Sequence, residues 1–391
     1  MTTLTHLLTD DARGARSSVI REILALADTE DVLSLAGGMP DPATFPIDDL
    51  VVASSAAIRD GSGAALQYGR TEGMPELRAL LAHRFGDRCG RARTTDEVLV
   101  TSGSQQALDL LGRAFVSPGD TVAIEDPGYL GAIQAFGQRR PQWLTVPVDR
   151  HGLDTADLEA SIRRGARPKL VYTVTDFQNP TGAVLHPDRR RHLAALADRW
   201  GFVVIEDDPY GQIRFDEPEH APIARWTDRV VSLGTTSKTI APGLRIGWAI
   251  APPDIVSAVA RLKQAADLHT SSLGQHLVAD LLSRPGWMAA RGRSLGAFYA
   301  DRAEILRTAL TAALPGATIE PPRGGLFLWA DLPGTDTRAL LPRAVAAGVA
   351  FVPGSAFSPT DDGATTTLRA TFATLAPDGL EEAARRLGSV A

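Results

Sequence analysis

The chain has 391 residues, of which 44% are apolar and 22% are charged, which is typical of a globular protein with one large domain and a smaller one. Its net charge of −6 and pI near 5.8 argue against nucleic acid or an anionic membrane as the main partner, although they are compatible with a local basic patch. Asp10 and Asp11 stand where a signal peptide would have its apolar core, and no apolar run approaches about 18 residues. We therefore expect a cytoplasmic protein without a membrane segment.

Residues 1–45 are expected to form an arm, in which SLAGGMPDPATFP is rich in glycine and proline. After it, short apolar runs alternate with stretches whose apolar residues have helical spacing. DEVLVTSG at 96–103 is predicted to be a strand, and SQQALDLLGRAF at 104–115 the helix that follows it. Further strand-and-turn units are expected at 120–129, 168–182, 202–211 and 229–238, with helices at 130–139 and 187–201. The last of these helices opens with proline and closes with glycine, the usual start and stop signals.

Nearly continuous apolar strands separated by helices indicate a mostly parallel sheet with helices on both faces. We therefore predict an α/β fold with a large domain over 46–285. After about residue 285 the pattern changes to longer helical stretches around RGGLFLWADLPG and GVAFVPGSAF, which indicates a smaller α+β domain over 286–391. The arm over 1–45 is expected to belong to the smaller domain and to cover the functional site.

Polar residues collect where the predicted strands end, at the edge where open α/β sheets bind ligands. They are Gly103, Ser104, Gln105, Asp126, Tyr129, Asn179, Asp207, Tyr210, Thr235, Ser237, Lys238 and Arg245. Each has an ordinary alternative, because serine often caps a helix, tyrosine is often a half-buried ring, QNPTG can be only a turn, and aspartate often pairs with a surface arginine. Together, however, they place a phosphate cradle, an aromatic plane, a carboxylate and an amine at one edge of one sheet.

This combination fits the cofactor pyridoxal 5′-phosphate (PLP), which needs an amine for its aldehyde and a carboxylate for its ring nitrogen. We predict that Lys238 forms an imine with PLP and that Asp207 keeps the ring nitrogen protonated. Tyr129 is expected to stack on the ring, and Asn179 and Tyr210 to hydrogen-bond its phenolic oxygen. The residues expected to surround the phosphate are Gly103, Ser104, Gln105, Thr235, Ser237 and Arg245.

Lysine is rare in this chain. Only Lys169, Lys238 and Lys263 are lysines among the 40 basic residues, and the rest are arginines. Lysine can form an imine with an aldehyde and arginine cannot. Lys169 starts a predicted strand, at the wrong edge of the sheet, and Lys263 lies in the helical stretch ARLKQAADLH, where a solvated side chain is expected. Lys238 is therefore the candidate for the reactive amine.

Eight motifs carry a resemblance to a known family. In chain order they are SLAGGMPDPATFP, LQYGRTEGMPELR, SGSQQALDL, FQNPTG, EDDPY, SKTIAPGLRIGW, PRGGLFLW and LRATFA. They occur in the order found in fold-type I PLP-dependent aminotransferases and cover nearly the whole chain. Within that family the sequence most resembles the subgroup of α-aminoadipate and kynurenine aminotransferases. The resemblance implies an enzyme that moves an amino group between an L-amino acid and a 2-oxo acid by a ping-pong mechanism.

The resemblance also implies substrate contacts. Arg369 in LRATFA matches the arginine that holds the substrate α-carboxylate with two parallel hydrogen bonds, whereas the residues alone would favour a solvated surface arginine. Asn179 and Gly38 are expected beside the substrate. Tyr68 matches a tyrosine that reaches the phosphate of the neighbouring subunit, which implies a homodimer with shared active sites. Arg21 matches a position that contacts the substrate side chain in some relatives, although an arginine on an amphipathic helix is the commoner outcome.

One departure from the family pattern lies just before the lysine. Many relatives have Ser-Phe-Ser there, whereas this chain has Thr235, Thr236 and Ser237. The hydroxyl three residues before Lys238 is retained, so phosphate binding is expected to persist. The missing aromatic side chain is expected to alter the packing nearby.

Other functions stay open at this point. PLP-dependent decarboxylases, cyclases and oxidases of unusual amino acids can share all these residues. A transcription regulator with an aminotransferase-like sensor would need a winged DNA-binding domain before SLAGGMPDP. The stretch before this motif is expected to have too few residues for such a domain. A metal enzyme is not favoured, because the eight histidines have no HExxH spacing and Cys89 is the only cysteine. Aromatic, branched, 2-aminoadipate-like and guanidino-bearing amino donors are all compatible with the sequence.

Overall fold

The computed structural model describes residues 4–9, 12–13, 23, 31–60, 62–360 and 365–391. Within these ranges the chain forms an eight-stranded sheet, a four-stranded sheet and a short two-stranded sheet. None of the helices described there is both long enough and apolar enough to cross a membrane.

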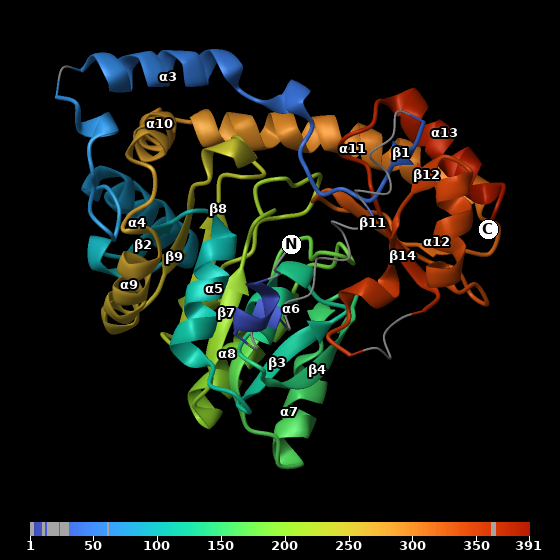
Figure 1. Ribbon diagram of the computed structural model, residues 1–391, viewed down its shortest axis with the longest axis horizontal. Helices are drawn as coiled ribbons and strands as arrows, with labels where there is room; N and C mark the ends of the chain where they lie inside the picture. Colours follow the sequence, from blue (N-terminus) through green and yellow to red (C-terminus); the bar gives the residue numbers. More distant parts are fainter. Residues whose placement is uncertain (1–3, 10–11, 14–22, 24–30, 61, 361–364) are drawn as a thin grey trace.

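The eight-stranded sheet has the strand order β2-β9-β8-β7-β6-β3-β4-β5. All neighbouring pairs from β8 to β4 are parallel, whereas β9 and β5 run antiparallel to their neighbours. The strands are β2 (Val98–Thr101), β3 (Thr121–Asp126), β4 (Gln142–Asp149), β5 (Gly152–Leu153), β6 (Pro168–Val174), β7 (Val203–Asp207), β8 (Val230–Thr235) and β9 (Gly247–Ile250). The mostly parallel sheet predicted from the sequence is therefore confirmed (Figure 1).

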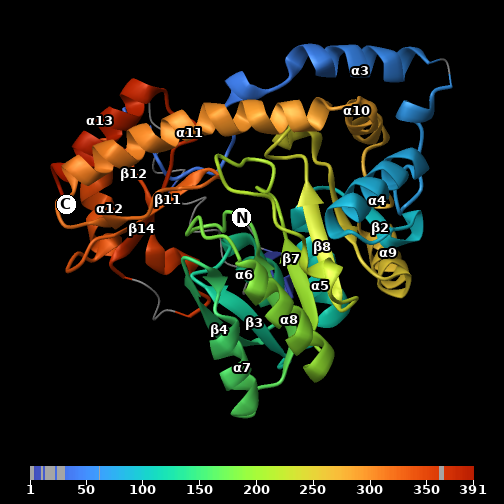
Figure 2. The same ribbon diagram turned by 180° about the vertical axis from the view of Figure 1, so that it is seen from behind.

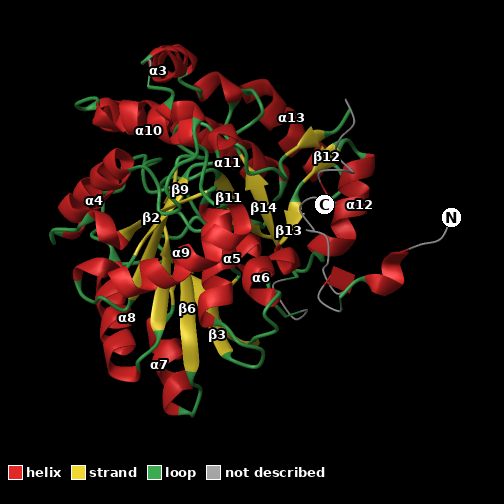
Figure 3. Ribbon diagram, turned by 60° about the vertical axis from the view of Figure 1, so that its left-hand side comes forward, coloured by secondary structure: helices red, strands yellow, loops and turns green. Residues whose placement is uncertain are grey.

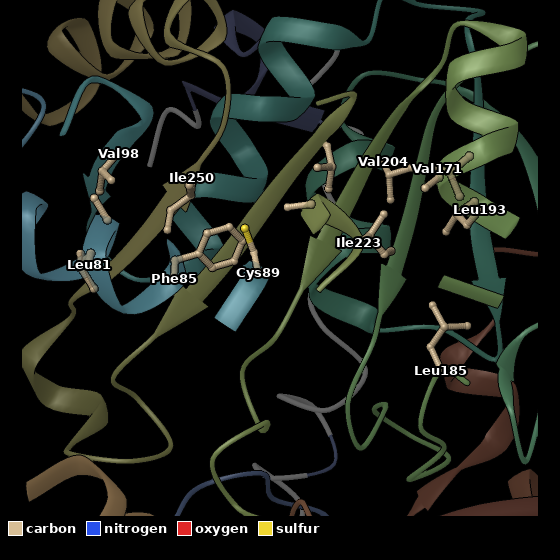
Figure 4. Close-up of a cluster of buried hydrophobic side chains, with 14 of the residues drawn as sticks. Leu81, Phe85, Cys89, Val98, Val171, Leu185, Leu193, Val204, Ile223 and Ile250 are labelled. Atoms are coloured by element: carbon tan, nitrogen blue, oxygen red, sulfur yellow. The ribbon is translucent and has the colours of Figure 1, made fainter. Parts of the chain in front are cut away.

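Helices cover both faces of this sheet (Figure 3). One face packs against α5 (Ser104–Phe115), α6 (Leu130–Gly137) and α9 (Pro253–Asp267). The other face packs against α4 (Pro75–Cys89), α7 (Thr155–Arg163), α8 (Pro187–Trp200) and α10 (Ser272–Ser283). On that second face Leu81, Phe85 and the buried thiol of Cys89 belong to one apolar cluster with Val98 and Ile250 (Figure 4).

The four-stranded sheet lies to one side of the larger sheet (Figure 2). Its order is β10-β11-β14-β13 and every pair is antiparallel. The strands are β10 (Thr318–Ile319), β11 (Phe327–Asp331), β13 (Val352–Pro353) and β14 (Thr367–Thr371), and the helices are α11 (Trp287–Ala313), α12 (Thr337–Ala346) and α13 (Pro377–Gly388). Helix α11 contacts α10 beside the larger sheet and α13 beside the smaller one, so it links the two layers.

The described part of the amino-terminal arm packs beside the smaller sheet. Strand β1 (Leu33–Ser34) pairs in parallel with β12 (Val349–Ala350). The backbone N–H of Asp41 donates to the hydroxyl of Tyr299 on α11 over 3.0 Å, and the Asp41 carboxylate lies 3.3 Å from Arg302. After the arm, α3 (Ile47–Arg59) lies along the outside of the molecule (Figure 1).

The expectation that Lys263 is solvated is wrong. Its side chain is fully buried, and its Nζ lies 2.6 Å from the Oδ1 of Asp267, one turn further along α9. The other Asp267 oxygen accepts from Ser102 Oγ at 2.9 Å and from Gln106 Nε2 at 2.7 Å. The buried pair therefore ties α9 to the loop that follows β2, and the acid compensates for the burial of the lysine charge.

Lys169 lies at the amino end of β6, as the sequence predicts. There its Nζ pairs with the Oδ2 of Asp120 at 2.8 Å. The division of the chain near residues 45 and 285 stays a prediction.

Candidate active site

Lys238 follows β8 by three residues, in the turn beyond the carboxyl edge of the larger sheet. Its Nζ donates to the backbone carbonyl of Gly38 in the arm over 2.6 Å. Burial lowers the pKa of Lys238 to about 8, and the positive charges of Arg369 and Arg245 act in the same direction. The amine is therefore far more often neutral, and so nucleophilic, than a lysine in water.

Asp207 is the last residue of β7 and is buried. The hydroxyl of Tyr172, on the neighbouring strand β6, donates to its Oδ2 over 2.8 Å. Its Oδ1 is also buried but has no hydrogen-bond partner among the described residues. Burial raises the pKa of Asp207 to about 7. A buried acceptor without a donor costs about 1–3 kcal/mol, so this oxygen marks a position where a donor from outside the chain fits.

Arg369 is in the middle of β14 and is 1% exposed, so the alternative of a solvated surface arginine is wrong. Its Nη1 donates to Asn179 Oδ1 over 2.9 Å and its Nη2 to the carbonyl of Ala36 over 2.5 Å. The guanidinium lies 4.1 Å from the ring centre of Phe327 and 5.0 Å from that of Phe357. Burial lowers its pKa to about 10, and its Nε has no partner among the described residues.

Two tyrosines lie among these charged groups. Tyr129 immediately precedes α6, and burial together with the negative charge of Asp207 raises its pKa to about 12. Tyr210 is buried three residues after Asp207 and contacts Phe327 edge-on with ring centres 5.9 Å apart, and the side chain of Asn179 acts on its hydroxyl. Because the charges of Asp207 and Arg369 act on both tyrosines, these side chains form one cluster.

An anion-binding arrangement lies at the start of α5. The helix begins at Ser104 after Gly103, whose φ of +79° is a conformation that glycine adopts without strain. Arg245 donates through Nη2 to the Ser102 carbonyl over 3.2 Å, and a Cβ on Gly103 would lie 2.5 Å from that nitrogen. The first N–H groups of a helix have no intrahelical acceptor and attract anions, so the helix end and the guanidinium together suit a phosphate.

The remaining predicted phosphate residues lie on the neighbouring turns. The Oγ1 of Thr235 donates to the Oγ of Ser237 over 2.9 Å, which directs both hydroxyls to the same turn before Lys238. Gln105, in the first turn of α5, donates through Nε2 to the Gly131 carbonyl over 3.0 Å, two residues after Tyr129.

Two predicted residues are not part of this cluster within the described chain. Tyr68 follows the 3-10 helix η3 (Ala64–Leu66), is 79% exposed, and packs edge-on against His269 with ring centres 5.7 Å apart. Arg21 lies outside the described residues.

Three residues of this cluster are not predicted from the sequence. Tyr172 is hidden in the apolar run KLVYTV, where its hydroxyl is the only hint that it faces a polar group. Phe327 and Phe357 look like ordinary core aromatics in sequence, and only the pairing of β11 and β14 brings Phe327 beside Arg369. Aromatic rings on a buried guanidinium stabilise its charge.

Residues 30–387 of the chain match the family model for aminotransferase class I and II. The chain is 39% identical over 386 residues to aromatic-amino-acid aminotransferase 1 of Thermococcus litoralis, a match that spans 97% of this chain and 92% of that protein. It is 40% identical over 380 residues to the 2-aminoadipate transaminase of Thermus thermophilus, spanning 95% of this chain and 93% of the relative.

The fold is similarly close to solved structures. The kynurenine aminotransferase of Pyrococcus horikoshii superposes with a TM-score of 0.94 at 38% identity, covering 98% of this chain and 96% of that one, and was solved in complex with PMP. The α-aminoadipate aminotransferase of Thermus thermophilus, in complex with N-(5′-phosphopyridoxyl)-L-leucine, superposes with a TM-score of 0.90 at 37% identity, covering 100% and 98% of the two chains. The predicted family, fold class, activity and cofactor are thereby confirmed. The chain belongs to the class I and II aminotransferases, PLP-dependent enzymes that transfer an amino group between an amino acid and a 2-oxo acid.

Proposed function

We propose that Lys238 and Asp207 are the residues that hold and activate PLP in this transaminase. When bound, PLP supplies an aldehyde that condenses with amines and a protonated ring that withdraws electrons. The observation that carries the proposal is the unpartnered, buried Oδ1 of Asp207 at the same sheet edge as the buried amine of Lys238. A ring N–H would give that oxygen its missing donor, and the amine is neutral often enough to react near neutral pH.

The other cofactor contacts follow from the geometry around these two groups. The amino end of α5 and Arg245 would hold the phosphate, with help from the hydroxyls of Ser104, Thr235 and Ser237 and from the amide of Gln105. Tyr129 would cover one face of the ring. Asn179 and Tyr210, whose side chains act on each other in this cluster, would both hydrogen-bond the phenolic oxygen.

Arg369 would bind the α-carboxylate of the substrate. Its guanidinium is held by Asn179 and Ala36 and flanked by two aromatic rings, which leaves it pre-oriented and without any carboxylate of the protein within hydrogen-bond reach in the described chain. Gly38, whose carbonyl accepts from Lys238, would lie over the bound amino acid. The amine of Lys238, once released by the incoming amino acid, would take up the Cα proton and return it later in the reaction.

We further propose that the enzyme accepts long and aromatic L-amino acids, including 2-aminoadipate, with 2-oxoglutarate as one acceptor. The names of the relatives at 39% and 40% identity support this range. The three parts of the chain, over 1–45, 46–285 and 286–391, would then act as a cover, a cofactor-binding domain and a carboxylate-binding domain.

We also propose a cytoplasmic homodimer. An apolar strip runs along the outside of the molecule on α3 and η3, and it consists of Ile47, Val51, Val52, Ile58, Leu66 and Tyr68, each more than half exposed. Such a strip is larger than isolated surface residues and is typical of a protein interface. Tyr68 at its end would reach the phosphate site of the partner.

Arg369→Lys is expected to lower kcat/KM for amino acid donors by roughly tenfold or more, because lysine cannot make the two parallel hydrogen bonds of a guanidinium. The measurement follows the absorbance of the yellow enzyme as aromatic amino acids, 2-aminoadipate, or branched and guanidino-bearing donors are added, and then glutamate formation from 2-oxoglutarate. Arg385→Lys, on the exposed surface of α13, is the matched control. Equal kcat/KM values for both variants, or no glutamate from any donor, would contradict the proposal.

Asp207→Asn is expected to change the pH dependence of stability of the enzyme without cofactor. The pKa of Asp207 is raised to about 7, so its stabilising contribution is complete below its unfolded pKa near 3.8 and is lost as the pH rises through 7. The thermal midpoint of the variant, relative to wild type, should therefore increase from pH 5 to pH 8. With PLP bound, the order of the two thermal midpoints at pH 8 should reverse, so that wild type is the more stable. A difference between the two midpoints that does not change with pH would refute the assignment. Asp96→Asn, at an exposed carboxylate, is the control.

Tyr68→Phe is expected to weaken PLP binding several-fold, because a hydrogen bond to a charged group is lost. When this variant is mixed with excess Lys238→Ala chains, mixed dimers form. In such a dimer the site that contains Lys238 receives Tyr68 from the Lys238→Ala partner, so its affinity for PLP should return to the wild-type value. Calorimetric titration with PLP and sedimentation of each sample provide the measurement. A monomer, or an affinity that mixing leaves unchanged, would exclude shared sites.

A further inference from the structure

A cavity of about 340 Å³ lies between α4, α10, the first turn of α11 and the carboxyl ends of β7 and β8. Successive residues of a strand point to opposite faces of a sheet. Accordingly Glu206 and Asp208 line this cavity, whereas Asp207 between them points to the candidate active site and does not. The cavity therefore lies on the other side of the sheet from Asp207, although Thr235, one of the predicted phosphate residues, also lines it.

The walls of the cavity are of two kinds. One part is apolar and aromatic, and it includes Leu81, Phe85, Trp248, Leu282 and Met288. Leu81 and Phe85 come from α4 and belong to the buried cluster shown in Figure 4. The other part is charged, and Arg84, Arg88, Asp208 and Glu219 are its main members.

Most charges of the polar wall are already paired. Arg88 lies 2.8 Å from an oxygen of Asp208 and 2.5 Å from one of Glu219. Those two carboxylates raise the pKa of the Arg88 guanidinium against the effect of its burial. Arg88 therefore pairs with both carboxylates, and its single positive charge compensates one of their two negative charges. Glu206 accepts from Ile223 N and from Ser232 Oγ, so its oxygens are satisfied as well.

Arg84 is different. It precedes Arg88 by one helical turn, so both side chains lie on the same face of α4. No hydrogen bond or ion pair joins its guanidinium to a described residue. The negative charges of Glu219, which also pairs with Arg88, and of Asp87, which is 69% exposed, nevertheless raise its pKa. Burial and the charge of Arg88 both lower its pKa. A half-buried cation of this kind is stabilised by an anion from outside the chain.

We propose that this cavity binds a small organic carboxylate with an apolar, ring-sized body, which goes beyond the proposed transaminase function. The carboxylate would pair with Arg84, and the body would lie against Phe85, Trp248 and Met288. A volume of about 340 Å³ falls within the range of known ligand pockets. A ring-sized carboxylate such as phenylacetate fits within this volume.

The cavity borders two segments that carry groups of the candidate active site. Its lining includes Asp208 and Pro209, which directly follow Asp207, and Thr235 and Thr239, of which Thr239 directly follows Lys238.

The test is calorimetric titration of the PLP-loaded enzyme with phenylacetate. Because Arg369 would also attract this carboxylate, the titration is carried out in the Arg369→Leu background, where only the cavity remains. We expect one phenylacetate per chain, with a dissociation constant that Arg84→Met raises by roughly tenfold or more. Ala289→Phe, at an exposed position on the cavity rim, is expected to abolish binding by closing the entrance.

Arg113→Met, which removes an arginine from α5 on the other face of the sheet, is the matched control and should leave the titration unchanged. Circular dichroism of each variant verifies folding, and Ala289→Phe decides the question if Arg84→Met fails to fold. No binding at millimolar phenylacetate in the Arg369→Leu background would overturn the proposal. Binding that neither Arg84→Met nor Ala289→Phe weakens would overturn it equally. Because none of these readouts is turnover, they leave the transaminase assignment untouched.

Discussion

The site depends on one energetically unfavourable feature, a buried carboxyl group in which only one of the two oxygens accepts a hydrogen bond. Asp207 receives the hydroxyl of Tyr172 on one oxygen and has no donor for the other within the described chain. Burial raises its pKa to about 7, so the group is close to half protonated at neutral pH. A ring N–H would supply the missing donor and favour the ionised form. The larger sheet, which places Asp207 at the end of β7, gives this carboxyl group its position.

The positive charges around that carboxyl explain the rest of the site. Arg369 and Arg245 both lower the pKa of Lys238, and burial adds to their effect. Three cations converging on one region repel each other unless anions lie between them. A phosphate near Arg245 and a substrate carboxylate at Arg369 would supply those anions. A similar arrangement of charges lies on the other face of the sheet. There Arg88 forms ion pairs with two carboxylates, whereas Arg84 forms none with the described residues.

The sequence predicts the parallel sheet and the residues at its carboxyl edge well, because strand ends, turn residues and a scarce lysine are local features. It fails where the outcome depends on pairing between distant segments. Lys263 looks solvated in its helix, but Asp267 and the loop after β2 bury it. Arg369 looks like a surface arginine without the resemblance, and only the packing of the smaller sheet against the arm encloses it. Tyr172 looks like core, since its partner Asp207 lies on another strand.

The function proposed for this chain requires that the ε-amino group of Lys238 forms a covalent bond with the aldehyde of PLP. Borohydride reduction of the enzyme incubated with PLP, followed by proteolysis and mass spectrometry, tests this bond directly. We expect a phosphopyridoxyl adduct on the peptide that contains Lys238 and none on the peptides of Lys169 and Lys263. A colourless protein without any reducible adduct, or an adduct on either of the other two lysines alone, would contradict it.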